Sequence, residues 1–310
     1  KGDEVITQSF TFVATVEAII ESNATPICAN IDKTLNLDPL CLERSITKNT
    51  KAVIVVHMLG TPANLVKIKK ICETHKIALI EDTAWGCGGS INNKPLGTWG
   101  DIGTFSFDFA KTITTGEGGM VISNNQHIYE KAKAWHDHGH ENNPNLPRWE
   151  DSRTNSGFNY RMMELQGAVG IAQLKKLDQI VASQRKNKKL LWDAICDIKG
   201  IECRAKPSGS FETADALVFF VPSKELAKKC RANLLKNGLA TKILPEAFTW
   251  HFAGCWSHMK ELMDSHKNNI NKDLMQSYEL LSKAVAIPIT VKDQSNLTFP
   301  LRNSIIEVMS

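Results

Sequence analysis

The sequence predicts an α/β fold, in which a mostly parallel sheet is covered by helices, followed by a smaller α+β C-terminal domain. Two observations predict it. Short apolar runs alternate with stretches of helical periodicity through the first half of the 310 residues, as is typical of strands buried on both faces and joined by crossover helices. The second half contains longer helical stretches and only two strand candidates. We expect a large domain over residues 1–185 and a small domain over residues 186–310.

The strands of the first half are short and mostly apolar. They are expected at residues 4–7, 26–29, 52–56, 77–80, 103–107 and 119–123. Helices are expected at residues 13–21, 64–75 and 126–135; in the second of these, Leu65, Ile68 and Ile71 recur at helical spacing. Ligands of such sheets bind beyond the carboxyl ends of the strands, so we expect functional residues there.

The second half begins with a polar stretch, residues 141–156, which has two prolines and no periodicity. It is expected to be a loop, and its length favours a functional role. A long helical stretch follows at about residues 163–198, with a break expected near Asp178. The last elements are strands at 216–221 and 285–290 and helices at 224–237 and 271–282. Pro288 cannot donate to a strand ladder, so it places the last strand at an edge.

Composition excludes several classes of protein. With 42% hydrophobic and 23% charged residues, the chain is not disordered, collagen-like or a coiled coil. A net charge of +4 spread along the chain does not predict a nucleic-acid partner. No apolar run approaches the roughly 18 residues of a membrane helix, and we expect no signal peptide. The eight cysteines form no C-x-x-C pair, which favours reduced thiols in a cytoplasmic protein.

Two ionisable residues follow strands at the expected sheet edge. Asp82 comes after residues 77–80, where an acid can cap a helix, bind a metal or pair with a cationic ligand group; capping is the default for a single residue. Lys111 follows the aromatic stretch 105–110, where burial could lower its pKa and leave a neutral amine able to form a Schiff base. Position alone favours a lysine that reaches solvent.

Other candidate motifs are weaker. The glycine-rich segments 86–90 and 116–119 fit neither the P-loop nor the dinucleotide fingerprint. The alternating His136, His138 and His140 lack nearby cysteines, so they favour a polar wall of a site, and no metal is expected.

Four longer segments occur in the order found in a known family. They are GDEVITQSFTFVATVEAI (residues 2–19), IEDTAWGCGGS (80–90), LGTWGDIGTFSFDFAKTITTGEGGMVISNN (96–125) and GFNYRMMELQGAVGIAQLKKLD (157–178). This set closely resembles the DegT–StrS family of pyridoxal-phosphate-dependent sugar aminotransferases, densely over residues 2–189. The resemblance implies a fold type I aminotransferase with pyridoxal 5'-phosphate as its cofactor.

The resemblance also implies a role for individual residues. Lys111 forms the Schiff base with the cofactor, and Asp82 pairs with its pyridine nitrogen. Phe12 stacks on the ring, although an aromatic residue just past a strand is usually core. Ser106 bonds the phosphate, and Asn159 reaches the phosphate of the neighbouring subunit, which implies a homodimer with shared active sites.

Two differences from the family pattern stand out. Trp85 occupies a position near the cofactor ring where relatives usually have Gln or His, so it is expected to contact the cofactor, by stacking or by filling space. The family also has a further N-terminal segment, whose Ser-Gly-Thr turn holds the phosphate at a helix N-terminus. Since the sequence opens at Lys1 directly before the first strand, we expect the large domain to lack this segment. The chain is then either a fragment or a protein with half of the phosphate site.

The reaction implied is the transfer of an amino group from an amino acid, most often glutamate, to a keto sugar in two half-reactions. Relatives that dehydrate sugars have histidine in place of the lysine, so Lys111 favours transamination. Shorter segments at residues 111–114, 137–140, 184–189 and 250–251 resemble the transaminases that make 8-amino-3,8-dideoxy-octulosonate for lipopolysaccharide.

An acidic keto sugar of this kind needs cationic contacts, for which Arg161 and His251 are candidates; Arg161 could equally pair with Glu164. Three alternatives stay open. They are an aminotransferase for a nucleotide-linked keto sugar, a non-catalytic cofactor-binding or regulatory family member, and a truncated product that does not fold stably.

Overall fold

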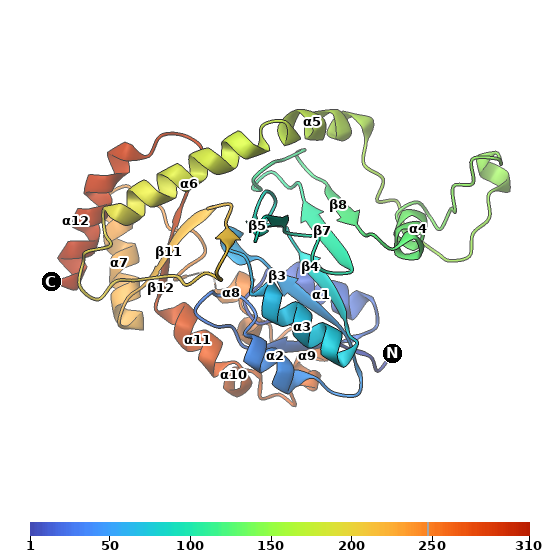
Figure 1. The fold of residues 1–310 in the computed structure, drawn as a ribbon. Coiled ribbons are helices and arrows are strands. Elements are labelled where there is room, and N and C mark those ends of the chain that lie inside the picture. Colours follow the sequence, from blue (N-terminus) through green and yellow to red (C-terminus); the bar gives the residue numbers. More distant parts are fainter. Residues whose placement is uncertain (247) are drawn as a thin grey trace.

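A computed structural model describes residues 1–246 and 248–310, and in this part of the chain the centre is a six-stranded sheet (Figure 1). Its order is β2-β1-β3-β4-β7-β8. The strands are β1 (Glu4–Gln8), β2 (Thr25–Ala29), β3 (Thr50–Val56), β4 (Ala78–Asp82), β7 (Ile102–Ser106) and β8 (Gly119–Ile122). All neighbours pair in parallel except β8, which is antiparallel to β7. The predicted, mostly parallel sheet is confirmed.

Helices cover both faces of this sheet. On one face, α2 (Pro39–Ser45) and α3 (Leu65–His75) share a core with side chains of β1, β3 and β4, among them Val53 and Val55. On the other face, α1 (Val13–Glu21) and α9 (Lys260–Ser265) share a core that contains Val56. Successive side chains of a strand point to opposite faces, so the continuous apolar run of β3 serves both cores.

A second, smaller sheet has the order β12-β11-β9. Its strands are β9 (Glu202–Cys203), β11 (Ala216–Phe220) and β12 (Ala284–Pro288), packed with α6 (Leu177–Asp193), α7 (Lys224–Lys236) and α12 (Thr298–Met309). β12 is an edge strand, as Pro288 predicts. The predicted domain boundary at 185/186 lies inside α6, and residues of β11, β12 and α11 (Met275–Ser282) join the core of the large sheet. The division into two domains stays a prediction.

The middle of the chain projects from the body. The segment between α4 (Gln126–Trp135) and α5 (Glu164–Leu174) extends away from the sheet as an arm (Figure 1). Only Lys175 and Lys176 lie between α5 and α6, so the predicted long helix is broken there, close to the expected position. The remaining strands and α-helices are short: β5 (Ser90–Ile91), β6 (Lys94–Pro95), β10 (Ser210–Phe211), α8 (Phe248–His251) and α10 (Ile270–Asp273). Within the described residues, every helix is too short or too polar to cross a membrane.

Candidate active site

Lys111 and Asp82 lie at the same edge of the large sheet. Asp82 is the last residue of β4, and Lys111 follows the end of β7, which pairs with β4 in parallel. Burial lowers the pKa of Lys111, and the positive charge of Lys242 acts in the same direction. The carboxylates of Asp108, Asp82 and Asp215 oppose these effects only in part, so the pKa of Lys111 lies below its usual value. A lysine amine of lowered pKa is a better nucleophile toward a carbonyl carbon near neutral pH.

Both oxygens of Asp82 accept hydrogen bonds. The backbone N–H of Ala84 donates to Oδ1 at 3.1 Å, and the Thr15 hydroxyl donates to Oδ2 at 2.9 Å. These donors fix the carboxylate plane and leave lone pairs for a cationic partner. Thr15 lies in the first turn of α1, so the position of this helix start determines the orientation of the Asp82 carboxylate.

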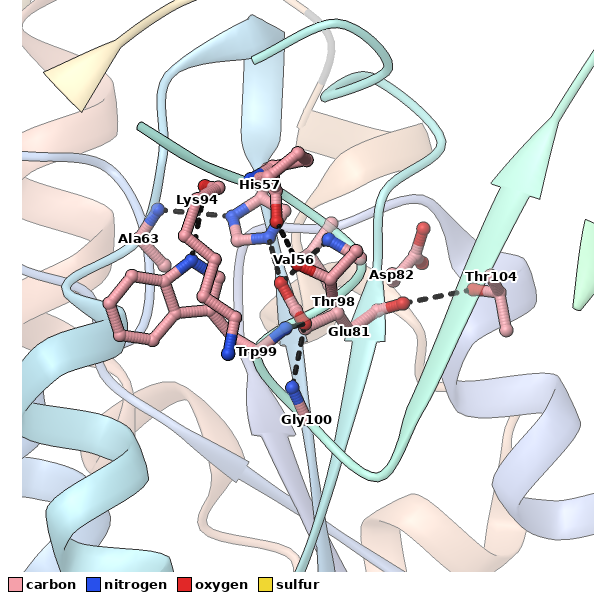
Figure 2. Close-up of polar contacts among 12 residues, drawn as sticks. Val56, His57, Ala63, Glu81, Asp82, Lys94, Thr98, Trp99, Gly100 and Thr104 are labelled. Atoms are coloured by element: carbon pink, nitrogen blue, oxygen red, sulfur yellow. Dashed lines mark hydrogen bonds and ion pairs between the residues drawn. The ribbon is translucent and has the colours of Figure 1, made fainter. Parts of the chain in front are cut away.

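Glu81, the residue before Asp82, anchors the strand end on the opposite face (Figure 2). Its side chain is fully buried, as is that of His57, whose Nε2 lies 3.3 Å from Glu81 Oε2. Since His57 Nδ1 accepts the N–H of Ala63 at 3.1 Å, Nε2 bears the proton and donates to Glu81. The carboxylate also accepts three backbone N–H groups, from Gly97, Trp99 and Gly100, at 2.8, 2.5 and 2.8 Å.

This network sets the ionisation of Glu81. Burial raises the pKa of its carboxyl group, but the hydrogen bonds from His57, Gly100 and Gly97 outweigh burial and place the pKa below its usual value. A buried ionised carboxylate with four donors is satisfied. The network therefore holds the end of β4, and with it Asp82, in a fixed position.

The indole of Trp85 contacts two lysines. The Nζ atoms of Lys111 and Lys242 lie 4.1 and 4.7 Å from the centre of its ring, within the range of cation–π attraction. Lys242 also pairs with Asp215 at 2.7 Å, and the Thr213 hydroxyl donates to the carbonyl of Trp85 at 3.1 Å. Residues of the C-terminal half thus complete the site around Lys111.

Phe12 and Ser106 are placed at the same edge. Phe12 precedes α1 with its side chain 40% exposed, and its ring centre lies 5.6 Å from that of His251. Ser106 ends β7 and its Oγ accepts the N–H of Asp108 at 3.4 Å. An accessible aromatic face, a hydroxyl, a carboxylate and an amine of lowered pKa can together hold a flat, polar, carbonyl-bearing ligand.

Asn159 and Arg161 lie instead on the arm. Asn159 forms a backbone bridge with Asp137, and the Arg161 guanidinium donates to the Asp137 carboxylate. Arg148 donates to both oxygens of Asp137, at 2.9 and 2.6 Å. The hydrogen bonds from Arg148 and Arg161 outweigh burial and hold the pKa of Asp137 well below its usual range. The partner of Arg161 is therefore Asp137 rather than Glu164.

The short segments that suggested an octulosonate enzyme make contacts within the chain. His140 pairs with Asp151 at 3.2 Å on the arm, and Lys188 of α6 pairs with Glu212 at 2.7 Å. Among the described residues, no group of three or more His, Cys, Asp or Glu side chains is arranged to hold a metal ion.

Sequence analysis missed four residues of the site. Thr15 and Thr11, whose Oγ1 atoms lie 2.8 Å apart, carried one weak signal, their i, i+4 spacing at the expected start of a helix. Lys242 and Asp215 carried none, since Lys242 reaches Trp85 from a distant segment of the chain and Asp215 contacts Lys242.

The profile of the DegT/DnrJ/EryC1/StrS aminotransferase family matches residues 1–296. The chain belongs to this family. GDP-perosamine synthase of Vibrio cholerae is 40% identical over 186 residues, which are 60% of this chain and 49% of that protein. UDP-4-amino-4,6-dideoxy-N-acetyl-beta-L-altrosamine transaminase of Helicobacter pylori is 34% identical over 195 residues, 62% of this chain and 50% of that one. The chain spans about half the length of the curated relatives it matches.

Solved structures of aminotransferases share the fold of this family member. Helicobacter pylori PseC, an aminotransferase of pseudaminic acid biosynthesis, superposes with a TM-score of 0.86 at 23% identity, covering 99% of this chain and 80% of PseC. A 3-amino-5-hydroxybenzoic acid synthase gives 0.87 at 24% identity over the same shares of the two chains. The predicted fold type I architecture is confirmed.

Proposed function

We propose that the protein is a pyridoxal-phosphate-dependent aminotransferase that moves an amino group from an amino acid, glutamate, to the carbonyl carbon of a keto sugar. The observation that carries the proposal is Lys111, an amine of lowered pKa at the sheet edge beside Asp82. Membership of an aminotransferase family and the likeness to aminotransferase structures support it.

The residues present fit pyridoxal phosphate. Lys111 would hold its aldehyde carbon, Asp82 its ring nitrogen, Phe12 and Trp85 its ring, and Ser106 its phosphate. The carboxylate of Asp82 already has donors on both oxygens and lone pairs to spare, which is the arrangement that a protonated ring nitrogen needs. When bound, this cofactor would supply an electron-accepting ring and an aldehyde carbon that carries the amino group between the two substrates.

The side chains of this protein would hold and move the protons and exclude water. Asp82 keeps the proton on the ring nitrogen, because an anion beside it favours the charged form. The Lys111 amine would take the proton from the donor's Cα and return a proton to the acceptor carbon. Phe12 and Trp85 cover the reacting atoms and reduce the access of water.

The acceptor that we propose first is an acidic keto sugar, 8-oxo-3-deoxy-octulosonate, made into its 8-amino form for lipopolysaccharide. The segments of residues 111–114, 137–140, 184–189 and 250–251 support this choice. His251, beside Phe12, is the first candidate for a substrate contact. Arg161, which pairs with Asp137 on the arm, is the second candidate for such a contact. A nucleotide-linked keto sugar is the second candidate, favoured by the GDP- and UDP-sugar relatives.

A homodimer with shared active sites is the assembly that we propose. The segment between α4 and α5 projects from the body as an arm (Figure 1), and Asn159 of this arm forms a bridge with Asp137. In the proposed dimer, Asn159 would serve the phosphate of the partner subunit. We also propose that the enzyme works in the cytoplasm, which agrees with the free thiol state of its eight cysteines, all in the described part of the chain.

The test of this function is the visible absorption of the purified chain with pyridoxal phosphate. We expect a yellow Schiff-base band that Lys111→Ala abolishes, because Lys111 has an amine of lowered pKa on which the Asp82 charge acts, whereas Lys242 is paired with Asp215 at 2.7 Å. Lys33→Ala, which changes an exposed lysine paired with Glu202, should keep the band. Glutamate should then bleach the band, and a screen of acidic and nucleotide-linked keto sugars should restore it with one class.

Two results would count against the proposal. A band equally strong in Lys111→Ala would show that the cofactor reacts elsewhere. A Lys111-dependent band that no amino acid bleaches would indicate the non-catalytic alternative, a protein that only binds the cofactor.

A further inference from the structure

Two buried threonine hydroxyls form a chain that ends on Asp82. Thr15 Oγ1 donates to Asp82 Oδ2 at 2.9 Å, and the Oγ1 atoms of Thr11 and Thr15 lie 2.8 Å apart. A hydroxyl has only one proton to donate. Because Thr15 donates its proton in the hydrogen bond to Asp82, the Thr15 oxygen must accept the hydrogen bond from Thr11. The carboxylate therefore fixes the direction of both hydrogen bonds.

The surroundings make this chain rigid. Thr11 is 0% and Thr15 is 6% exposed, and a hydrogen bond to a charged group is stronger where water is excluded. The backbone N–H of Thr11 donates to the carbonyl of His251 at 2.9 Å, which fastens the segment to α8. Between the two threonines lies Phe12, so one short segment presents both the aromatic ring and the hydroxyl that orients the carboxylate.

We infer that Thr15, supported by Thr11, is a positioning residue that fixes the Asp82 carboxylate for the ring nitrogen of the cofactor. The inference rests on the proposed function. The Ala84 N–H holds Oδ1 and the Thr15 hydroxyl holds Oδ2, so together they prevent rotation of the carboxylate. Without the hydroxyl the carboxylate can turn, its contact with the ring nitrogen weakens, and the nitrogen loses its proton more easily.

The test compares Thr15→Val, which keeps the shape of the side chain without its hydroxyl, with Thr15→Ser, which keeps the hydroxyl. We expect Thr15→Val to slow the bleaching of the yellow band by glutamate about tenfold, as the loss of one hydrogen bond to a charged group predicts. The pH midpoint of the band in the absence of donor should rise, because a positive charge lost from the ring nitrogen makes the Schiff-base nitrogen easier to protonate. Thr15→Ser should match the wild type in both measurements.

Thr11→Val removes the donor to Thr15 and should change the rate and the midpoint in the same directions by less. It decides the question if Thr15→Val does not fold, which thermal melting of the cofactor-free variants would show. The inference is overturned if the valine variants behave as the wild type, or if Thr15→Ser is impaired as much as Thr15→Val. A wild-type chain that forms no band would overturn the proposed function itself, and this inference with it.

Discussion

Trp85 contacts both Lys111 and Lys242, and Lys242 is paired at 2.7 Å with Asp215 in the other half of the chain. Lys242 thus adds a positive charge near Lys111 and at the same time neutralises a negative one. Both effects keep the pKa of Lys111 low, and a neutral amine is the form that attacks a carbonyl.

Two substitutions in this pair should therefore shift the pKa of Lys111 in opposite directions. Lys242→Met removes a like charge and leaves the Asp215 carboxylate uncompensated, so the pKa of Lys111 should rise. Asp215→Asn leaves Lys242 uncompensated, so the pKa should fall. The measurement is the pH dependence of Lys111 acetylation, followed by mass spectrometry, with Lys33 as the exposed reference in every sample. Shifts of the same sign in both variants would contradict this account.

At the scale of elements, Glu81 joins the end of β4 to the loop of residues 97–100 and to His57 after β3 (Figure 2). Glu81→Gln leaves only one acceptor oxygen for these donors, so the free energy of unfolding should fall by about 2–3 kcal/mol at neutral pH. The measurement is urea unfolding. As a control, Glu73→Gln changes an exposed ion pair on α3 and should lower the free energy of unfolding by less than about 0.5 kcal/mol.

The effect of Glu81→Gln on the free energy of unfolding should decrease on acidification. The pKa of Glu81 is lower in the folded state than its usual value of 4.5, so its ionised form stabilises the fold fully above that value. The contribution is lost as the pH falls through the lowered folded pKa. The difference in the free energy of unfolding between wild type and Glu81→Gln should therefore stay constant from about pH 7 to about pH 5 and shrink as the pH falls below 4.5. A difference that grows on acidification would mean that Glu81 is not ionised in the folded protein.

The elements differ in how far the sequence predicts them. The parallel strands were predictable because most of their residues are apolar, and Asp82 and Lys111 because Asp82 ends one strand and Lys111 follows another. α2 was missed because its 7 residues are too few to show a period, although Asp38 followed by Pro39 is a helix-start signal. α12 was missed because Pro300 in its first turn interrupts the pattern that Leu301 and Ile305 continue. The Trp85–Lys242 contact depends on tertiary packing, which no local pattern reports.

At the scale of the whole molecule, α5 is the element that the proposed dimer would explain. None of the 11 residues of α5, all of them described, is buried. Three large apolar side chains of this helix are therefore open to solvent: Leu165, Ile171 and Leu174 are 73%, 63% and 58% exposed. Apolar side chains gathered on a surface helix indicate an interface. The arm that bears Asn159 leads directly into this helix, so a second copy bound here would meet both.

The double variant Leu165→Glu/Ile171→Glu should therefore be a monomer where the wild type is a dimer, because two carboxylates would be buried without partners in the interface. Light scattering behind a sizing column measures this, and Leu40→Glu/Val66→Glu, which changes similarly exposed apolar residues on α2 and α3, should stay dimeric. If Asn159 serves the partner's phosphate, the monomer should also bind pyridoxal phosphate at least about tenfold more weakly. A monomer that binds the cofactor as tightly as the dimer would confine each active site to one chain, and Asn159 would then have no part in it.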